Sequence, residues 1–266
     1  MGAALAFRYR PTWTGWRGAR AWAVAFFLGA ALYLPSLTLL QTPWQRAASH
    51  GMAAVLPTAP PLLLAIVPVL VSALVQEPAK LLCTVGAWRL APLVRALPTD
   101  PTLLGILVGA GYGAMEVLVL LSAAFAAAST HPELGPATIA IPVAATTFTL
   151  VFQAAATGLV ARVWARIPAT GVWSRAVSGN QVPPGERVRA LLKAARRVEV
   201  VGAMKALALV VGLHALLYYM STVTAVGTLP VWTGEAMRAT FSLSIFALLL
   251  RQATPPPPAT RDLLPQ

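Results

Sequence analysis

Six runs of apolar residues dominate the chain, and short segments rich in arginine, proline and polar residues separate them. A helix needs about 20 apolar residues, at roughly 1.5 Å per residue, to cross a hydrocarbon core about 30 Å thick. Each run is long enough for this. The runs cover residues 21–40, 61–88, 102–127, 137–164, 199–222 and 229–250. The pattern predicts an all-α, polytopic bundle of about six transmembrane helices.

The composition agrees with a chain that folds in lipid. Of its 266 residues, 58% are hydrophobic and 11% are charged, whereas roughly 25% are charged in an ordinary soluble domain. The predicted organisation is a basic N-terminal segment at 1–20, a bundle at 21–252 that includes a basic loop at 167–197, and a proline-rich disordered tail at 253–266.

The net charge of +12 follows membrane topology rather than forming a nucleic-acid-binding patch. Nearly all arginines and lysines outside the spans lie in segments on one side of the membrane, and Arg46 is the exception. By the positive-inside rule, the protein is a multi-pass protein of the cell membrane with cytoplasmic N- and C-termini. Residues 187–197 form either a helix lying on anionic lipid headgroups or a solvated lead-in to the fifth span. No nucleic-acid partner is expected.

Few ionisable side chains lie within the spans. Placing one in lipid costs free energy, so such a side chain usually has a partner or a function. Glu77 and Lys80 are three residues apart on one face of the second span, where they can form an ion pair. Glu235 and Arg238 have the same spacing near the outer end of the sixth span, and we expect that pair to lie outside the main cluster.

A glycine stripe runs along the third span toward a carboxyl group. Gly105, Gly109, Gly113 and Glu116 fall on one face, and Tyr112 lies beside it. Because glycine lets another backbone approach closely, a neighbouring helix is expected to pack against the Glu116 side chain.

Polar residues of the fourth and fifth spans lie at a similar depth. Thr146, Thr149, Gln153 and Thr157 form a polar stripe on the fourth span, and His214 precedes Tyr218 by one turn on the fifth. The Gln153 amide is expected to reach another helix. Measured from the cytoplasmic ends, Glu77, Glu116, Gln153 and His214 lie roughly 14–24 Å deep. Four helices can therefore direct polar groups into one buried cavity.

Two carboxyl groups, an imidazole and an amide in a dry cavity can perform general acid–base chemistry on water and hold an oxyanion. A divalent metal is the alternative. One histidine and two separated glutamates are a thin ligand set, so the spacing alone does not predict zinc.

The motifs and their order resemble the PrsW and YhfC type intramembrane peptidases of the CAAX-protease (CPBP) superfamily. In that family a Glu-Glu-x-x-Lys/Arg helix is followed by a Gly-x-Gly-aromatic-x-x-x-Glu helix and by two helices that each present a histidine. The corresponding segments here are Gln76 to Lys80, Gly109 to Glu116, Phe152-Gln153, and Leu213 to Leu217. Gln76 replaces the first family glutamate and Gln153 the first histidine.

The resemblance implies hydrolysis of membrane protein or peptide substrates, by a glutamate-activated water or by a bound divalent metal such as zinc. The catalytic residues it implies are Glu77, Glu116, His214 and Gln153, and the supporting residues are Gln76, Lys80, Gly109, Gly113 and Tyr112. Glu77, Glu116 and His214 are the ligands if a metal is present. Two other hypotheses remain: an inactive homologue that binds membrane-protein clients, and a small transporter.

Overall fold

The computed structural model describes residues 16–90, 98, 100–130, 137–165, 198–225 and 230–252, and its elements in these ranges are all helical. The helices are α2 (Trp16–Pro35), η2 (Ser36–Gln41), α3 (Thr42–Val55), α4 (Pro61–Leu90), α5 (Pro101–Thr130), α6 (Ala137–Ala165), α9 (Val198–Ala225) and α10 (Val231–Gln252). The all-α prediction is confirmed. The loop at 167–197, its segment at 187–197, the tail at 253–266 and most of the N-terminal segment lie outside the described residues.

Within the described residues, five helices are long and apolar enough to cross a membrane, as a multi-pass membrane protein requires. They are Ala19–Val55, Pro61–Trp88, Pro101–Thr130, Thr146–Ala165 and Val200–Thr224. Helix α10 forms where the sixth span was predicted, but it is not among these five. It carries Glu235 and Arg238 in its first half. Its helical state is confirmed, and its passage through the membrane stays a prediction.

The first predicted span, 21–40, ends too early. α2, η2 and α3 form one continuous helix, and its apolar stretch covers 37 residues from Ala19 to Val55. At 1.5 Å per residue this stretch is about 55 Å long, so it must tilt or project beyond the hydrocarbon core. Pro43 lies in the first turn of α3, and a proline ring clashes with the carbonyl four residues back in a regular α-helix. The wide π turn of η2 relieves that clash and bonds the Thr42 N–H to the Leu37 carbonyl, five residues back.

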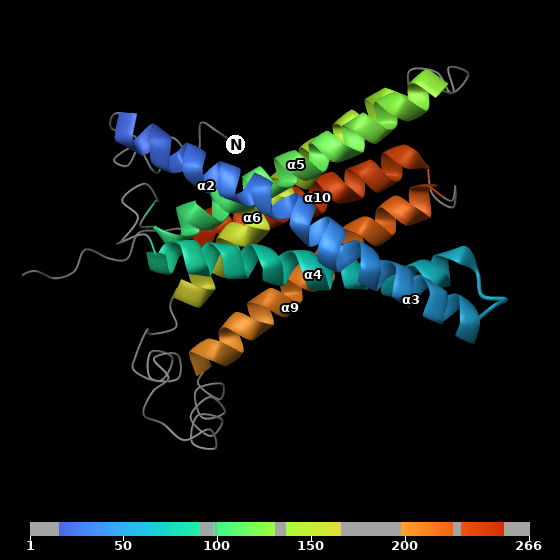
Figure 1. The fold of residues 1–266 in the computed structure, drawn as a ribbon, viewed down its shortest axis with the longest axis horizontal. Helices are drawn as coiled ribbons and strands as arrows, with labels where there is room; N and C mark the ends of the chain where they lie inside the picture. The colour runs from blue at the N-terminus through green and yellow to red at the C-terminus, as the bar shows by residue number, and fades with distance from the viewer. Residues whose placement is uncertain are drawn as a thin grey trace, which may run out of the picture.

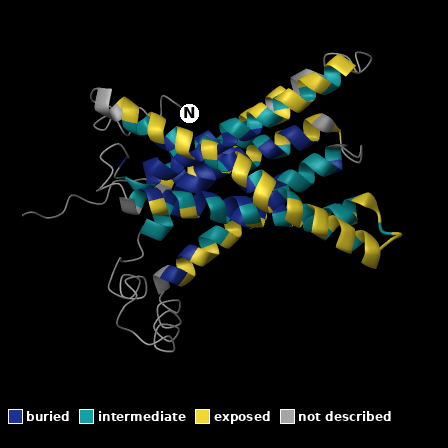
Figure 2. Ribbon diagram, viewed as in Figure 1, coloured by how far each residue is buried: buried dark blue, intermediate teal, exposed yellow. Residues whose placement is uncertain are grey.

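The helices cross near their midpoints, and the core lies at that crossing. α5 packs along α6 and also against α2, while α4 contacts α3, α5 and α9, and α10 contacts α6 and α9 (Figure 1). Buried residues concentrate at the crossing and exposed residues at the helix ends (Figure 2). The largest apolar cluster there includes Ile106, Phe152, Leu159, Val210 and Leu249. Polar side chains at mid-helix are buried in this core.

The glycines of α5 allow two helices to approach it closely. A Cβ at Gly113 would lie 2.9 Å from the Cβ of Gln153 on α6, and one at Gly109 would overlap the Gln153 carbonyl oxygen. The predicted packing against the glycine stripe is confirmed. Gly111 faces another helix, and a Cβ there would overlap the carbonyl oxygen of Phe26 on α2.

We expect Gly111→Ala to destabilise the fold by about 1–3 kcal/mol, because the added methyl group would push α2 away from α5. Gly212→Ala is the matched control, since no atom of a neighbouring element lies within 4 Å of a Cβ at that helical position. The test compares the midpoints of thermal unfolding of the two variants in the same detergent. Equal midpoints would contradict the close approach of α2.

Candidate functional site

Glu77 of α4 lies at the centre of a buried polar network. One of its carboxylate oxygens accepts a hydrogen bond from Lys80 Nζ at 2.6 Å and also contacts Nδ1 of His214 on α9. The exposed fractions of Glu77, Lys80 and His214 are 2%, 0% and 2%. The predicted ion pair between Glu77 and Lys80 is confirmed, and it compensates two charges that would be costly alone at this depth.

Gln153 of α6 joins this ion pair to the second carboxyl group. Its Oε1 accepts a hydrogen bond from Lys80 Nζ, and its Nε2 donates to Glu116 Oε2 on α5 at 2.7 Å. Gly113 makes room for this approach, because a side chain there would meet the Gln153 Cβ. The prediction that Gln153 reaches another helix is confirmed. The structure brings the four intramembrane polar residues of similar depth together, and with Lys80 they form what we call the buried network.

Tyr112 closes the buried network on the side of the first helix. Lys80 Nζ lies 5.3 Å from the centre of the Tyr112 ring, within the range of a cation–π interaction. The Tyr112 hydroxyl is hydrogen-bonded to Ser36 Oγ of η2 at 2.8 Å, and its ring packs edge-on against Tyr33 at 5.0 Å. Tyr112 was a predicted supporting residue, whereas Ser36 and Tyr33 were not predicted.

Gln76 connects the buried network to polar residues that the sequence analysis missed. Its Nε2 donates to Gln41 Oε1 at 2.9 Å and to Ser72 Oγ at 3.3 Å, and its Oε1 accepts from Gln153 Nε2 at 3.4 Å. The spacing of these residues in the sequence could have predicted that they lie together. Gln41 and Gln45, like Ser72 and Gln76, are separated by four residues, and each pair therefore shares one helix face.

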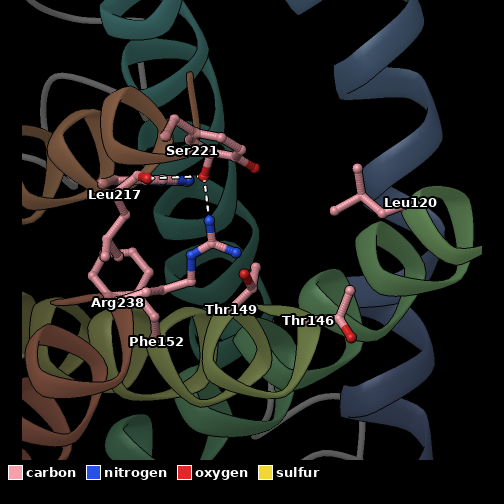
Figure 3. Close-up of a pocket in the computed structure, with 9 residues that line it drawn as sticks. Leu120, Thr146, Thr149, Phe152, Leu217, Ser221 and Arg238 are labelled. Carbon is pink, nitrogen blue, oxygen red and sulfur yellow. Dashed lines mark hydrogen bonds between the residues drawn. The ribbon is translucent and has the colours of Figure 1, made fainter. Parts of the chain in front are cut away.

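A cavity of about 300 Å³, here called the His214 cavity, lies beside the buried network. Its wall combines apolar side chains such as Phe152 and Leu120 with Arg238 (Figure 3). His214 also lines it. The His214 ring stacks on Tyr218 at 4.8 Å and meets Phe152 edge-to-face at 5.3 Å. Its Nε2 is buried and has no hydrogen-bond partner within the described part of the chain. The ring therefore has one nitrogen fixed by Glu77 and a second available for a ligand.

Arg238 of α10 also belongs to this cavity. The predicted pair is confirmed, since Nη1 of Arg238 lies 3.5 Å from Glu235 Oε1. Glu235 is not part of the cavity wall, but the expectation that the pair lies outside the main cluster does not hold for Arg238, which lines the cavity with His214 and donates to Ser221 Oγ on α9 (Figure 3). α10 packs against both α6 and α9, and the guanidinium reaches α9 through its bond to Ser221.

The candidate metal ligands do not form a metal centre. Across the described residues, no three His, Cys, Asp or Glu side chains are grouped as metal ligands. Glu116 bonds to Gln153 rather than meeting Glu77 and His214. The Lys80 ammonium lies at the point where the Glu77 and Gln153 oxygens converge, which gives the site its own fixed positive charge. The divalent metal implied by the family resemblance does not fit this donor set.

Comparison of the chain with protein-family models, with curated proteins and with solved structures gives no match.

Proposed function

We propose that this protein is a membrane-embedded peptidase that hydrolyses membrane protein or peptide substrates, with His214 and Glu77 as its proton-transferring pair. The observation that carries the proposal is the geometry of His214. Glu77 contacts Nδ1, while Nε2 is unpaired among the described residues and the ring lines a largely apolar cavity. Many hydrolytic enzymes use a carboxylate that orients an imidazole beside the substrate.

His214 suits the role of base better than Glu77, which the family resemblance would select. Lys80 and His214 both engage the same Glu77 oxygen, and Glu77 is not part of the cavity wall. With Nδ1–H donated to Glu77, Nε2 carries the lone pair and can accept a proton from water. The resulting hydroxide adds to the substrate carbonyl carbon. The same nitrogen then returns the proton to the departing amine as the C–N bond breaks.

Arg238 and Glu116 have different places in this mechanism. Arg238 is the fixed cation in the cavity wall, and it can stabilise the oxyanion that forms during attack. Glu116 acts at a distance, because its hydrogen bond to Gln153 orients the amide that accepts from Lys80. Leu120 lines the cavity and is 44% exposed on the bundle surface, so a substrate can enter from the lipid.

Purified protein in nanodiscs, mixed with a panel of single-span substrates, tests the proposal. The expected result is cleavage within or next to the substrate span, with the new termini identified by mass spectrometry. Absence of cleavage across the panel, with substrate still bound, would contradict peptidase activity and favour the second candidate function.

The second candidate is a protein on the same scaffold that binds membrane-protein clients without cutting them. The observation that favours it concerns Gln76 and Gln153. In the family that the chain resembles, these positions hold a glutamate and a histidine, whereas here both amides are engaged in hydrogen bonds. A Gln76→Glu, Gln153→His double variant separates the two functions. A client-binding protein should bind equally well before and after the change, and only the variant should cleave.

A further inference from the structure

A second cavity, about 320 Å³ in volume, lies between α3, α4 and α9. Six of its seven lining residues carry an amide or a hydroxyl group, and Val69 is the exception. The six are Gln41, Gln45, Ser72, Tyr218, Ser221 and Thr222. We call it the polar cavity, in contrast to the more apolar His214 cavity.

The chemistry of the polar cavity suits water rather than lipid. Cavities that offer several hydrogen-bonding groups hold water, and at roughly 30 Å³ per molecule this one has room for on the order of ten waters. Its amides keep donor capacity, because each amide nitrogen carries two N–H groups and the bonds from Gln41 to Gln45 and from Gln45 to the Pro68 carbonyl, at 3.3 and 3.2 Å, use one each. An acyl chain here could not accept a hydrogen bond from the remaining N–H groups of these amides, whereas water can.

The polar cavity leads toward the buried network. Gln76 Nε2 contacts three of its lining residues, Gln41, Ser72 and Tyr218, the last at 3.5 Å. Gln76 in turn contacts Gln153. A polar path therefore runs from the cavity wall to the side chains that hold both carboxyl groups.

The polar cavity also adjoins the His214 cavity. Tyr218 and Ser221 line both cavities, and the Tyr218 ring stacks on His214. Val69 lies in the first third of α4, and Thr222 lies in the last turn of α9, so the polar cavity is nearest the bundle end where α3 turns into α4 (Figure 1).

We propose that the polar cavity is a water-filled vestibule through which solvent reaches the buried network and the His214 cavity from the α3–α4 end of the bundle. Hydrolysis in lipid requires such a path. The proposal nevertheless depends on the cavity and its hydrogen bonds, so it stands or falls separately from peptidase activity.

Thiol labelling provides the test, because Cys83 is the only cysteine of the chain. In a Cys83→Ala background, Val69→Cys places a thiol in the polar cavity, and Leu70→Cys places one on the adjacent residue of α4, where leucine is 40% exposed on the bundle surface. Thr58→Cys, in the exposed turn between α3 and α4, marks the side from which the reagent should arrive. Each protein in sealed vesicles is treated with a charged methanethiosulfonate that does not cross membranes.

We expect Val69→Cys to react at least ~10-fold faster than Leu70→Cys, because thiolate forms in water and not in lipid. Labelling should come from the same side as labelling of Thr58→Cys. The side chain of Leu70 is more exposed than that of Val69, so surface exposure alone would predict the opposite order. Thr222→Cys is a second reporter on the facing helix, in case the α4 variant lowers the unfolding midpoint. Slow reaction at both cavity positions, with full reaction after denaturation, would overturn the proposal.

Discussion

Replacing His214 with alanine is expected to lower kcat/KM for peptide cleavage by about 10²- to 10⁴-fold, the range that one general acid–base side chain contributes. The imidazole lines the His214 cavity, and its Nε2 has no partner within the described residues. The bundle should still fold, because Glu77 keeps its 2.6 Å bond to Lys80 in the variant. Cleavage of a single-span substrate in nanodiscs gives the rate, and thermal unfolding of the same samples gives the stability.

A control and a rescue separate catalysis from structure in this experiment. His50 is exposed on α3, and His50→Ala should leave kcat/KM unchanged. Added imidazole can occupy the space left in His214→Ala and should restore part of the rate, which it could not do for a residue with a purely structural role. If His214→Ala cleaves at the wild-type rate, His214 is not the base.

Replacing Lys80 with methionine is expected to destabilise the bundle by about 3–5 kcal/mol, the usual cost of leaving one charge of a buried pair without its partner. Lys80 is 0% exposed, and its ammonium contacts Glu77, Gln153 and the face of Tyr112. Methionine fills a similar volume without the charge. Thermal unfolding, followed by the fluorescence of the chain's 8 tryptophans, measures the loss.

The Lys80→Met, Glu77→Gln double variant should recover most of that stability, because it removes both charges together. Lys205→Met is the matched control. Lys205 is exposed on α9, where its ammonium can extend to the membrane interface, so its loss should cost little. A double variant no more stable than Lys80→Met would mean that Lys80 contributes through packing rather than through its pairing with Glu77.

The parts of the site that the sequence predicted are those fixed by position along a helix. Apolar length locates the helices. The three-residue spacing along the helix predicted the pairing of Glu77 with Lys80. The distance from the cytoplasmic helix ends predicted that Gln153 and His214 lie at the level of Glu116. These quantities depend only on helix geometry, which every helix shares.

The parts that the sequence missed depend on how each helix is rotated against its neighbours. Arg238 was assigned away from the main cluster because nothing in α10 alone shows that its guanidinium turns toward α9. Gln41 lies just beyond the predicted first span, because the apolar run was taken to end at residue 40 although the helix continues through η2 and α3. The contact between Lys80 and Gln153 depends on rotation in the same way, since it joins α4 to α6 across the bundle.

The π turn of η2 also sets the angular phase between the two halves of the first membrane helix. Each residue of an α-helix advances by about 100°, so the extra residue held in a π turn rotates everything after it by that angle. One continuous helix can thereby present α2 to α5 and, beyond Gln41, present α3 to α4. Loss of a single residue between Ser36 and Gln41 would swing Gln45 away from the polar cavity and toward lipid. The apolar run would hardly change, yet the bundle would lose its hydrophilic inner surface on that side.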